Sequence, residues 1–276
     1  MKSKEMFPGI FSRHATEYQR RLEEVMSRGE AVGRMRVIEL VEARPGMRIL
    51  DLACGPATLS KRLAPLVEPG GEVVGIDLAA GMIDLARAIR IGNARFEVMD
   101  IEHLALADAS FDGAVCGHGL QFAPNLAAAL AEAHRVLRPG ARLAASIPVG
   151  AGHGQGGRAW ALVDEVIDRR LPPAARAVDQ QPTRDVVGDP DSLTQAALAA
   201  GFKTAKVEVI EEKVVWESAS QLVSLLMSWW DCASRMEGLD AELRASIASD
   251  ARATLESAYP GPIETTGRNH VLLAIA

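Results

Sequence analysis

Three acidic residues stand at the ends of consecutive predicted strands, and together they could hold a nucleoside. Asp51, Asp77 and Asp100 each close a short apolar run that is typical of a buried strand. Because the carboxyl ends of parallel strands meet at one edge of a sheet, we expect the three carboxylates to lie close together. The second could hold a ribose diol, and the third could accept a hydrogen bond from an exocyclic amine. Such a set suits a cationic or amine-bearing nucleoside.

The segment that follows Asp51 predicts a ligand-binding loop. Residues 53–57 read Ala-Cys-Gly-Pro-Ala and lead into a helix predicted over residues 57–66. Small side chains let a ligand approach the backbone closely. The N–H groups at the start of the helix favour a carboxylate or a phosphate group. We therefore expect a ligand to lie against the backbone of this loop.

The first half of the chain alternates strands and helices, which predicts an α/β fold with a mostly parallel sheet and helices on both faces. Strands are predicted over residues 47–52, 72–77, 94–100, 111–117 and 141–149. Helices are predicted over residues 30–43, 57–66, 79–91 and 125–137. Right-handed crossovers bring the carboxyl ends of these strands to one edge, where such sheets bind their ligands.

The regular alternation stops at Val149, and the second half adds helices to the same sheet. A Gly-rich stretch over residues 150–157 and an irregular segment over residues 171–190 flank the first added helix. Helices are predicted over residues 158–170, 190–200, 218–236 and 239–258, and strands over residues 203–216 and 268–276. We therefore predict a core over residues 1–149, and a helical cap with the closing strands over residues 150–276.

The motifs resemble those of class I S-adenosylmethionine (SAM)-dependent methyltransferases, in particular the group similar to ubiquinone/menaquinone C-methyltransferases. Asp51-x-Ala53-x-Gly55 matches the first motif, in which Ala53 and Ala57 replace two of the usual glycines. Further matches occur in the family's order: Val74-Gly75-Ile76-Asp77, Met99-Asp100-Ile101, Gly119-Leu120-Gln121-Phe122 and Arg135-Val136-Leu137-Arg138-Pro139-Gly140. The resemblance implies a Rossmann-like sheet of seven strands, with the helical cap inserted after strands 5 and 6.

The resemblance also implies how the adenosine part of SAM is held. Asp77 would bind the ribose hydroxyls, and Asp100 would accept a hydrogen bond from the adenine N6 group. Three apolar residues would flank the adenine ring, namely Leu78, Met82 and Ile101.

For the methionine part, the resemblance places Asp51 near the amino group and Tyr18 over the end of the chain. The backbone path and the neighbourhood of the methyl-bearing sulfur would come from Ala53, Gly55, Cys116 and Gly117. The implied activity is methyl transfer from SAM to a small, largely apolar acceptor, which leaves S-adenosylhomocysteine. Whether the accepting atom is O, N or C stays open.

His118 is the candidate general base, because its ordinary pKa near 6.5 suits proton transfer at neutral pH. The alternative is a histidine that only lines the pocket wall. We predict no metal site, since no histidine pair has the spacing of a zinc-binding helix and Cys54, Cys116 and Cys232 are widely separated.

Acceptor recognition is expected in the second half of the chain, where all four tryptophans lie after residue 159. Trp229 and Trp230 could be helix core or could line a substrate pocket, because pockets are mainly apolar and aromatic. The candidate pocket residues are Gln121, Phe122, Trp160, Trp229 and Trp230.

Composition narrows the class of partner. A net charge of −6 argues against a general nucleic-acid binder, which needs a basic surface. We find no apolar run long enough to span a bilayer and no segment of the signal-peptide type. We therefore expect a cytoplasmic protein whose partner is a small molecule, and a homodimer is compatible with the sequence.

Two alternatives differ from methyl transfer. The fold could hold SAM while the cap performs another reaction or only binds. An NAD(P)-dependent oxidoreductase would instead use Gly152-His153-Gly154-Gln155-Gly156-Gly157, which matches G-x-G-x-x-G. We expect a hinge there instead, because no strand ending in an acid follows at the spacing that dinucleotide binding requires.

Overall fold

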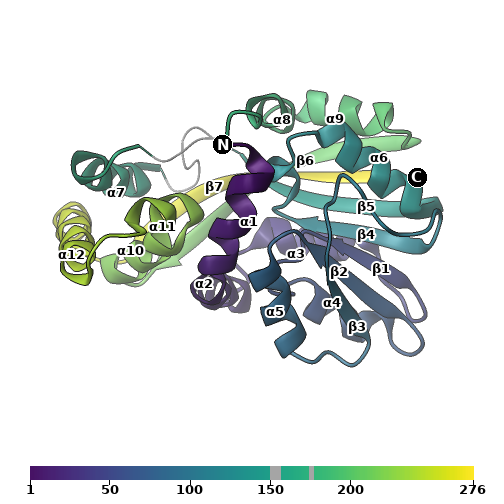
Figure 1. Cartoon of the computed structure of the whole chain (residues 1–276), viewed down its shortest axis with the longest axis horizontal. Coiled ribbons are helices and arrows are strands. Elements are labelled where there is room, and N and C mark those ends of the chain that lie inside the picture. The colour runs from purple at the N-terminus through teal and green to yellow at the C-terminus, as the bar shows by residue number, and fades with distance from the viewer. Residues whose placement is uncertain (150–156, 174–176) are drawn as a thin grey trace.

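The protein is built on one sheet of seven strands, shown in Figure 1 by a computed structural model that describes residues 1–149, 157–173 and 177–276. The strand order is β3-β2-β1-β4-β5-β7-β6, and β7 runs antiparallel to both of its neighbours. The strands are β1 (Arg48–Leu52), β2 (Glu72–Asp77), β3 (Ala94–Val98), β4 (Phe111–Gly117), β5 (Leu137–Val149), β6 (Thr204–Trp216) and β7 (Ile263–Ile275). This architecture confirms the predicted fold class.

Both faces of the sheet are buried, as the nearly continuous apolar strands require. Leu50 and Leu52 of β1 point to one face, and Ile49 points to the other, because side chains alternate along a strand. The first face is covered by α6 (Leu126–Val136) and α9 (Pro190–Ala199), and the second by α3 (Val32–Val41) and α4 (Ser60–Val67).

The helices at the N-terminus lie across the carboxyl edge of the sheet, where Figure 1 shows α1 in front of the strands. They are α1 (Ser3–Arg13) and α2 (Ala15–Ser27). Helix α1 packs against α5 (Ala80–Ala88), and the Ser12 hydroxyl accepts a hydrogen bond from the Gly81 N–H at 3.1 Å. A chain segment far from the strands in sequence therefore helps to enclose the edge at which their acids lie.

The cap lies to one side of the sheet (Figure 1) and has its own apolar core. It consists of α7 (Gly157–Arg170), α10 (Ala219–Ser228), α11 (Trp230–Met236) and α12 (Ala241–Ala258). Trp216 and Ile263, where β6 ends and β7 begins, are buried in the cap core. The two long strands thus join the cap to the sheet, and the insertions follow strands 5 and 6 as predicted.

Several boundaries differ from the sequence prediction. The helix predicted over residues 218–236 breaks at Trp229, whose backbone is extended although no glycine or proline is present. The Trp229 ring packs between Tyr18 and Trp160, so tertiary contacts accompany the break. The segment predicted to be irregular contains α8 (Gln181–Val187). The predicted hinge and the G-x-G-x-x-G match begin in residues outside those that the structure describes.

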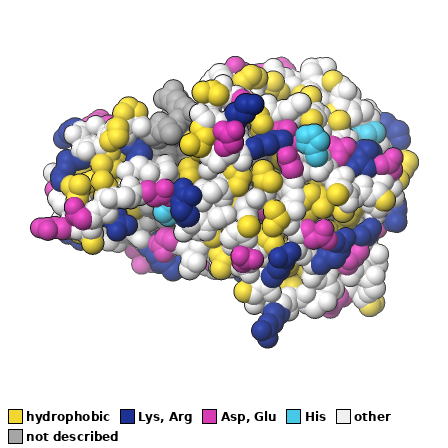
Figure 2. All heavy atoms as spheres, viewed as in Figure 1, with side chains coloured by type: hydrophobic (Ala, Val, Ile, Leu, Met, Phe, Trp, Pro, Cys, Tyr) yellow, Lys and Arg dark blue, Asp and Glu magenta, His cyan; other side chains and the backbone are white. Residues whose placement is uncertain are grey.

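Acidic and basic side chains are interspersed on the face shown in Figure 2, where they do not gather into a single basic field. Among the described residues, no helix is long and apolar enough to cross a bilayer.

Candidate active site

A cavity lies at the carboxyl edge of the sheet and brings together most of the residues singled out in the sequence. It is called the first cavity here, and α1 and α2 complete its wall. The predicted residues that line it are Tyr18, Asp51, Ala53, Gly55, Asp77, Leu78, Met82, Asp100, Ile101, Gly117, His118, Gln121, Phe122 and Trp229. Cys116 lies outside this group: it is completely buried in the sheet core beneath the cavity.

Asp51 is the most deeply buried of the three acids. One carboxylate oxygen, Oδ2, accepts a hydrogen bond from the Ser60 hydroxyl at 2.6 Å, whereas Oδ1 has no partner among the described residues. Burial raises the pKa of Asp51 to about 7, and the bond from Ser60 opposes this rise. The site thus holds a carboxyl group with one unsatisfied oxygen, and a cationic donor would stabilise its charged form.

Asp77 is tied to the backbone on both sides. Its Oδ2 accepts from the Gly55 N–H at 2.9 Å and its Oδ1 from the Ala79 N–H at 2.8 Å. Burial raises the pKa of this carboxyl, and the backbone donors oppose the rise. Asp77 therefore fixes the loop after β1 against the start of the segment that leads into α5.

The loop after β1 has the conformation that its glycine-rich family pattern requires. Ala53, Gly55 and Ala57 have φ values of 52°, 54° and 63°, which is the left-handed region. An alanine there costs roughly 1–2 kcal/mol relative to the right-handed conformation, whereas glycine adopts it readily. The two alanines noted in the sequence thus keep the glycine conformation at an energetic cost.

Asp100 is already engaged by a residue that the sequence prediction missed. The ammonium of Lys4, on α1, lies 2.6 Å from Asp100 Oδ2 and 2.5 Å from Glu102 Oε2. The Lys4 hydrogen bond is among the causes that hold the pKa of Asp100 below its ordinary value, although partial burial acts in the opposite direction. Helix α1 is thereby fastened to the cavity rim at the end of the third strand.

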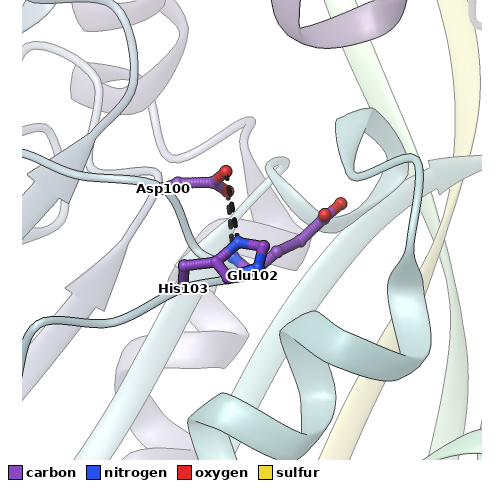
Figure 3. A group of neighbouring side chains, drawn as sticks. All are labelled: Asp100, Glu102 and His103. Carbon is purple, nitrogen blue, oxygen red and sulfur yellow. Dashed lines mark hydrogen bonds and ion pairs between the residues drawn. The ribbon is translucent and has the colours of Figure 1, made fainter.

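Asp100, Glu102 and His103 form a group of potential metal ligands, drawn in Figure 3. His103 Nδ1 faces Asp100 Oδ2 at 3.7 Å. The Lys4 ammonium already pairs with both carboxylates, and His103 is exposed. We therefore assign no cation to this group.

His118 lies just after β4, with a φ of 66°. Its Nε2 atom is buried and has no hydrogen-bond partner in the part of the chain that the structure describes. Burial, together with the nearby Arg34 cation, lowers the pKa of His118 well below its ordinary value. The imidazole is therefore neutral at neutral pH, and Nε2 is left available to a ligand.

A second cavity adjoins the first and shares five of its wall residues: Tyr18, Leu22, Arg34, His118 and Trp229. The remainder of its wall comes from elements that are far apart in sequence: Arg21, Val25, Ala31, Trp160, Glu212, Val214, Trp216, Leu225, Thr265 and Gly267. Three of the four tryptophans thus line one cavity, two of them also in the cap core.

The predicted acceptor residues divide between the two cavities. Gln121 and Phe122 line only the first, where the Gln121 side-chain N–H donates to the His118 carbonyl at 2.9 Å and Phe122 packs on Phe7. Trp160 lines the second, and Trp229 stands between the two. The side chain of Trp230 lies outside what the structure describes.

Comparison with known proteins places the chain in a family. Residues 50–145 match a family model described as a methyltransferase domain. The chain is 31% identical over 247 residues to the nocamycin O-methyltransferase of Saccharothrix syringae, an alignment that covers 84% of this chain and 86% of that protein. The chain belongs to the class I SAM-dependent methyltransferases.

Other similarities are confined to the core or to the fold. The demethylmenaquinone methyltransferase of Desulfitobacterium hafniense is 36% identical over 112 residues, 39% of this chain and 44% of that protein. Across several curated relatives matched through this core, the chain covers 33% to 44% of their length. The crystal structure of YcgJ from Bacillus subtilis shares the fold, with a TM-score of 0.55 and 16% identity over 88% of this chain and 97% of that one.

Proposed function

We propose that this protein transfers a methyl group from SAM to a small, largely apolar acceptor. The observation that carries the proposal is the shared wall: the cavity with the strand-end acids meets the tryptophan-lined cavity at Tyr18, Arg34 and His118. SAM supplies a methyl group on a sulfonium, which leaves as a neutral thioether. Two adjoining chambers suit a donor and an acceptor that must meet at one carbon atom.

The residues of the first cavity fit the donor. The unpartnered Oδ1 of Asp51 can accept from the α-ammonium group of the methionine part, which would also lower the raised pKa of this carboxyl. Asp77 and Asp100 would accept from the ribose hydroxyls and the adenine amine. Lys4 then has to share Asp100 with the adenine.

The remaining assignments follow from position in the first cavity. Leu78, Met82 and Ile101 offer apolar surface for the adenine ring. Ala53, Gly55 and Gly117 leave room beside their backbone, with Cys116 packed beneath them, and Tyr18 would cover the methionine end. A side chain at Gly117 would take up this room and displace Leu59, because even its Cβ would lie 2.9 Å from Leu59 Cδ1.

The second cavity would hold the acceptor, with Trp160 and Trp229 in its wall. Gln121 and Phe122 would instead form part of the wall around the donor. A role of Trp230 in the acceptor pocket stays a prediction. His118 would orient the accepting atom through Nε2. Its low pKa makes it a weak base, so alignment of the two reactants would supply much of the rate.

Binding and turnover test the proposal separately. Calorimetry with S-adenosylhomocysteine should show one site per chain, and mass spectrometry of products formed from a panel of small acceptors should show the gain of one methyl group with SAM consumed. Binding of S-adenosylhomocysteine without methylation of any panel member would favour the non-methylating alternative. If S-adenosylhomocysteine did not bind, both the methyltransferase and the non-methylating alternative would be contradicted. Binding of NADH in that case would favour the oxidoreductase.

The absence of a nucleic-acid partner, the cytoplasmic location, the homodimer and the division at residues 149/150 stay predictions from the sequence.

A further inference from the structure

We propose that the acceptor is a planar molecule whose anionic oxygen, a carboxylate or a phenolate, pairs with Arg34 in the second cavity and receives the methyl group. This inference rests on the proposed function and specifies its substrate class. It is carried by three buried polar groups in the wall of this cavity that find, among the described residues, none of the partners such groups normally have.

Arg34 is the first of these groups. It is only 7% exposed, and its one hydrogen bond among the described residues is a long one, 3.4 Å, to the Tyr18 hydroxyl. No described carboxylate forms an ion pair with it. Burying an unpaired cation costs several kcal/mol, so a site of this kind is expected to meet an anion.

Arg21, in the wall of the same cavity, is a buried arginine that does have carboxylate partners. It is 8% exposed, nearly the same as Arg34, yet it binds Glu24 Oε2 at 2.9 Å and Glu17 Oε1 at 3.3 Å. The chain thus supplies carboxylates to one buried guanidinium and none of the described ones to the other. Arg34, unlike Arg21, lines both cavities, so an anion bound to it lies at their junction.

Trp160 is the second group. Its indole N–H is buried and has no partner among residues 1–149, 157–173 and 177–276, whereas the indole N–H of Trp216 donates to the Thr265 hydroxyl at 2.8 Å. The unsatisfied donor suits an oxygen of the ligand, and Trp160 lies edge-to-face with Trp229 at a ring-centroid separation of 6.2 Å. Rings of this kind favour a planar, aromatic occupant.

His118 Nε2 is the third group, and the carboxylate of Glu212, on β6, lines the same cavity. One oxygen of Glu212 accepts from the Gly33 N–H at 2.6 Å, which directs this carboxylate from β6 toward the start of α3. Glu212 can accept a hydrogen bond from an N–H or O–H of the acceptor. The wall therefore recognises a molecule with an acidic oxygen at one point and a donor at another.

Methyl transfer to an anionic oxygen needs no strong base. A lone pair of the anionic oxygen forms the new C–O bond, the C–S bond breaks, and its electron pair returns to the sulfur, which becomes neutral. No proton has to be removed, because the oxygen is already ionised when it binds. The low basicity of His118 agrees with this, and Arg34 acts by holding the oxygen in line with the methyl carbon.

The experiment compares 2-naphthoate with its neutral isostere 2-naphthamide by calorimetry, in protein saturated with S-adenosylhomocysteine. We expect the wild type to prefer the naphthoate by about tenfold or more. Arg34→Gln should abolish this preference and leave the affinity for S-adenosylhomocysteine within about threefold. Arg36→Gln is the matched control, because it removes the same charge from the same helix, where Arg36 pairs with Glu39 and Glu208 outside the cavity; it should keep the preference.

Three outcomes would overturn the inference. The first is a wild type that binds both probes equally. The second is an Arg34→Gln variant that keeps the naphthoate preference; if its affinity for S-adenosylhomocysteine also falls about tenfold or more, Arg34 serves the carboxylate of the donor. If Arg34→Gln does not fold, the test uses Trp160→Phe, which keeps an aromatic ring and removes the indole N–H. Several-fold weaker binding of naphthoate to this variant supports the inference. Unchanged binding is the third outcome that overturns it. A wild type that binds no S-adenosylhomocysteine contradicts the proposed function instead, while naphthoate titrated alone still reports on the cavity.

Discussion

The two cavities differ in charge and in the way the chain builds them. The first is walled by strand-end carboxylates, and each of these lies within a few residues of the strand that positions it. The second carries arginine and tryptophan side chains from α2, α3, α7, β6 and the break between α10 and α11. Local turns thus place the acids of the first cavity, and α1 and α2 complete its wall. The residues that line only the second cavity come from elements that are remote in the sequence, so substitutions among them need not alter the strand-end acids.

Among the changes considered, Asp77→Ala is expected to have the largest effect on binding in the first cavity relative to the second. The change removes the acceptor for two backbone N–H groups and for the proposed ribose contact, so the affinity for S-adenosylhomocysteine should fall about 100-fold, or about 3 kcal/mol. Calorimetry measures this. Asp84→Ala is the control, because it removes the same charge from an exposed site on α5. Affinity within about threefold of the wild type would remove Asp77 from the site.

Asp51→Asn should weaken S-adenosylhomocysteine binding and yet stabilise the empty protein at alkaline pH. The pKa of Asp51 is raised from about 4 in the unfolded chain to about 7 in the fold, so its contribution to stability is present at low pH and lost as pH rises through this window. Asparagine does not ionise. The advantage of the variant should therefore grow by roughly 1 kcal/mol per pH unit between about pH 4 and 7.

Denaturant melts of the ligand-free protein across this pH range measure the effect of Asp51→Asn, with Asp84→Asn as the matched control. Parallel stability curves for Asp51→Asn and the wild type would contradict the raised pKa. The comparison also tests whether the first cavity holds a carboxyl group that is poised for a cation.

Thr265→Val is expected to act on the second cavity alone. It leaves the buried indole N–H of Trp216 without its acceptor, which costs about 1–2 kcal/mol of unfolding free energy. Affinity for S-adenosylhomocysteine should stay within about twofold, because Thr265 lines only the second cavity. Thr266→Val, at the exposed neighbouring position of β7, should leave stability nearly unchanged. Equal effects of the two changes would mean that the indole contact contributes little.

The smallest effect is expected from Tyr18→Phe at the shared wall. The ring that packs on Phe11 and Trp229 is kept, and the lost hydrogen bond to Arg34 is long, so binding in either cavity should change by less than about threefold. Calorimetry with S-adenosylhomocysteine and with 2-naphthoate measures the two cavities in turn, and Tyr259→Phe is the control. A loss of tenfold or more in one of them would assign the hydroxyl to that ligand.

The sequence predicted the first cavity better than the second for a physical reason. Asp51, Asp77 and Asp100 follow directly from strand periodicity, because each lies at the end of its own strand. Lys4 and Arg34 were missed, since the contacts of Lys4 depend on how α1 packs against residues far along the chain, and the burial of Arg34 depends on how α3 packs in the fold. Arg34 and Arg36 lie two residues apart in the same helix, and nothing in the sequence indicates which of them will be buried without a carboxylate among the described residues.

The helix boundaries show the same limit. The break at Trp229 has no local breaker residue, and the short helix α8 lies in a segment rich in proline and aspartate that predicts a loop. Sequence periodicity predicts an element where one face repeats for several turns. It does not predict an interruption that accompanies packing between the cap and α2.

The placement of the tryptophans has an optical consequence. Trp160, Trp216 and Trp229 line the second cavity, and only Trp229 also lines the first. Intrinsic fluorescence of this protein therefore comes largely from the proposed acceptor chamber. A molecule that enters it meets three emitting rings, whereas one bound at the strand-end acids meets a single ring. Emission spectra recorded without any attached dye can thus report which of the two chambers has been filled, and in which order.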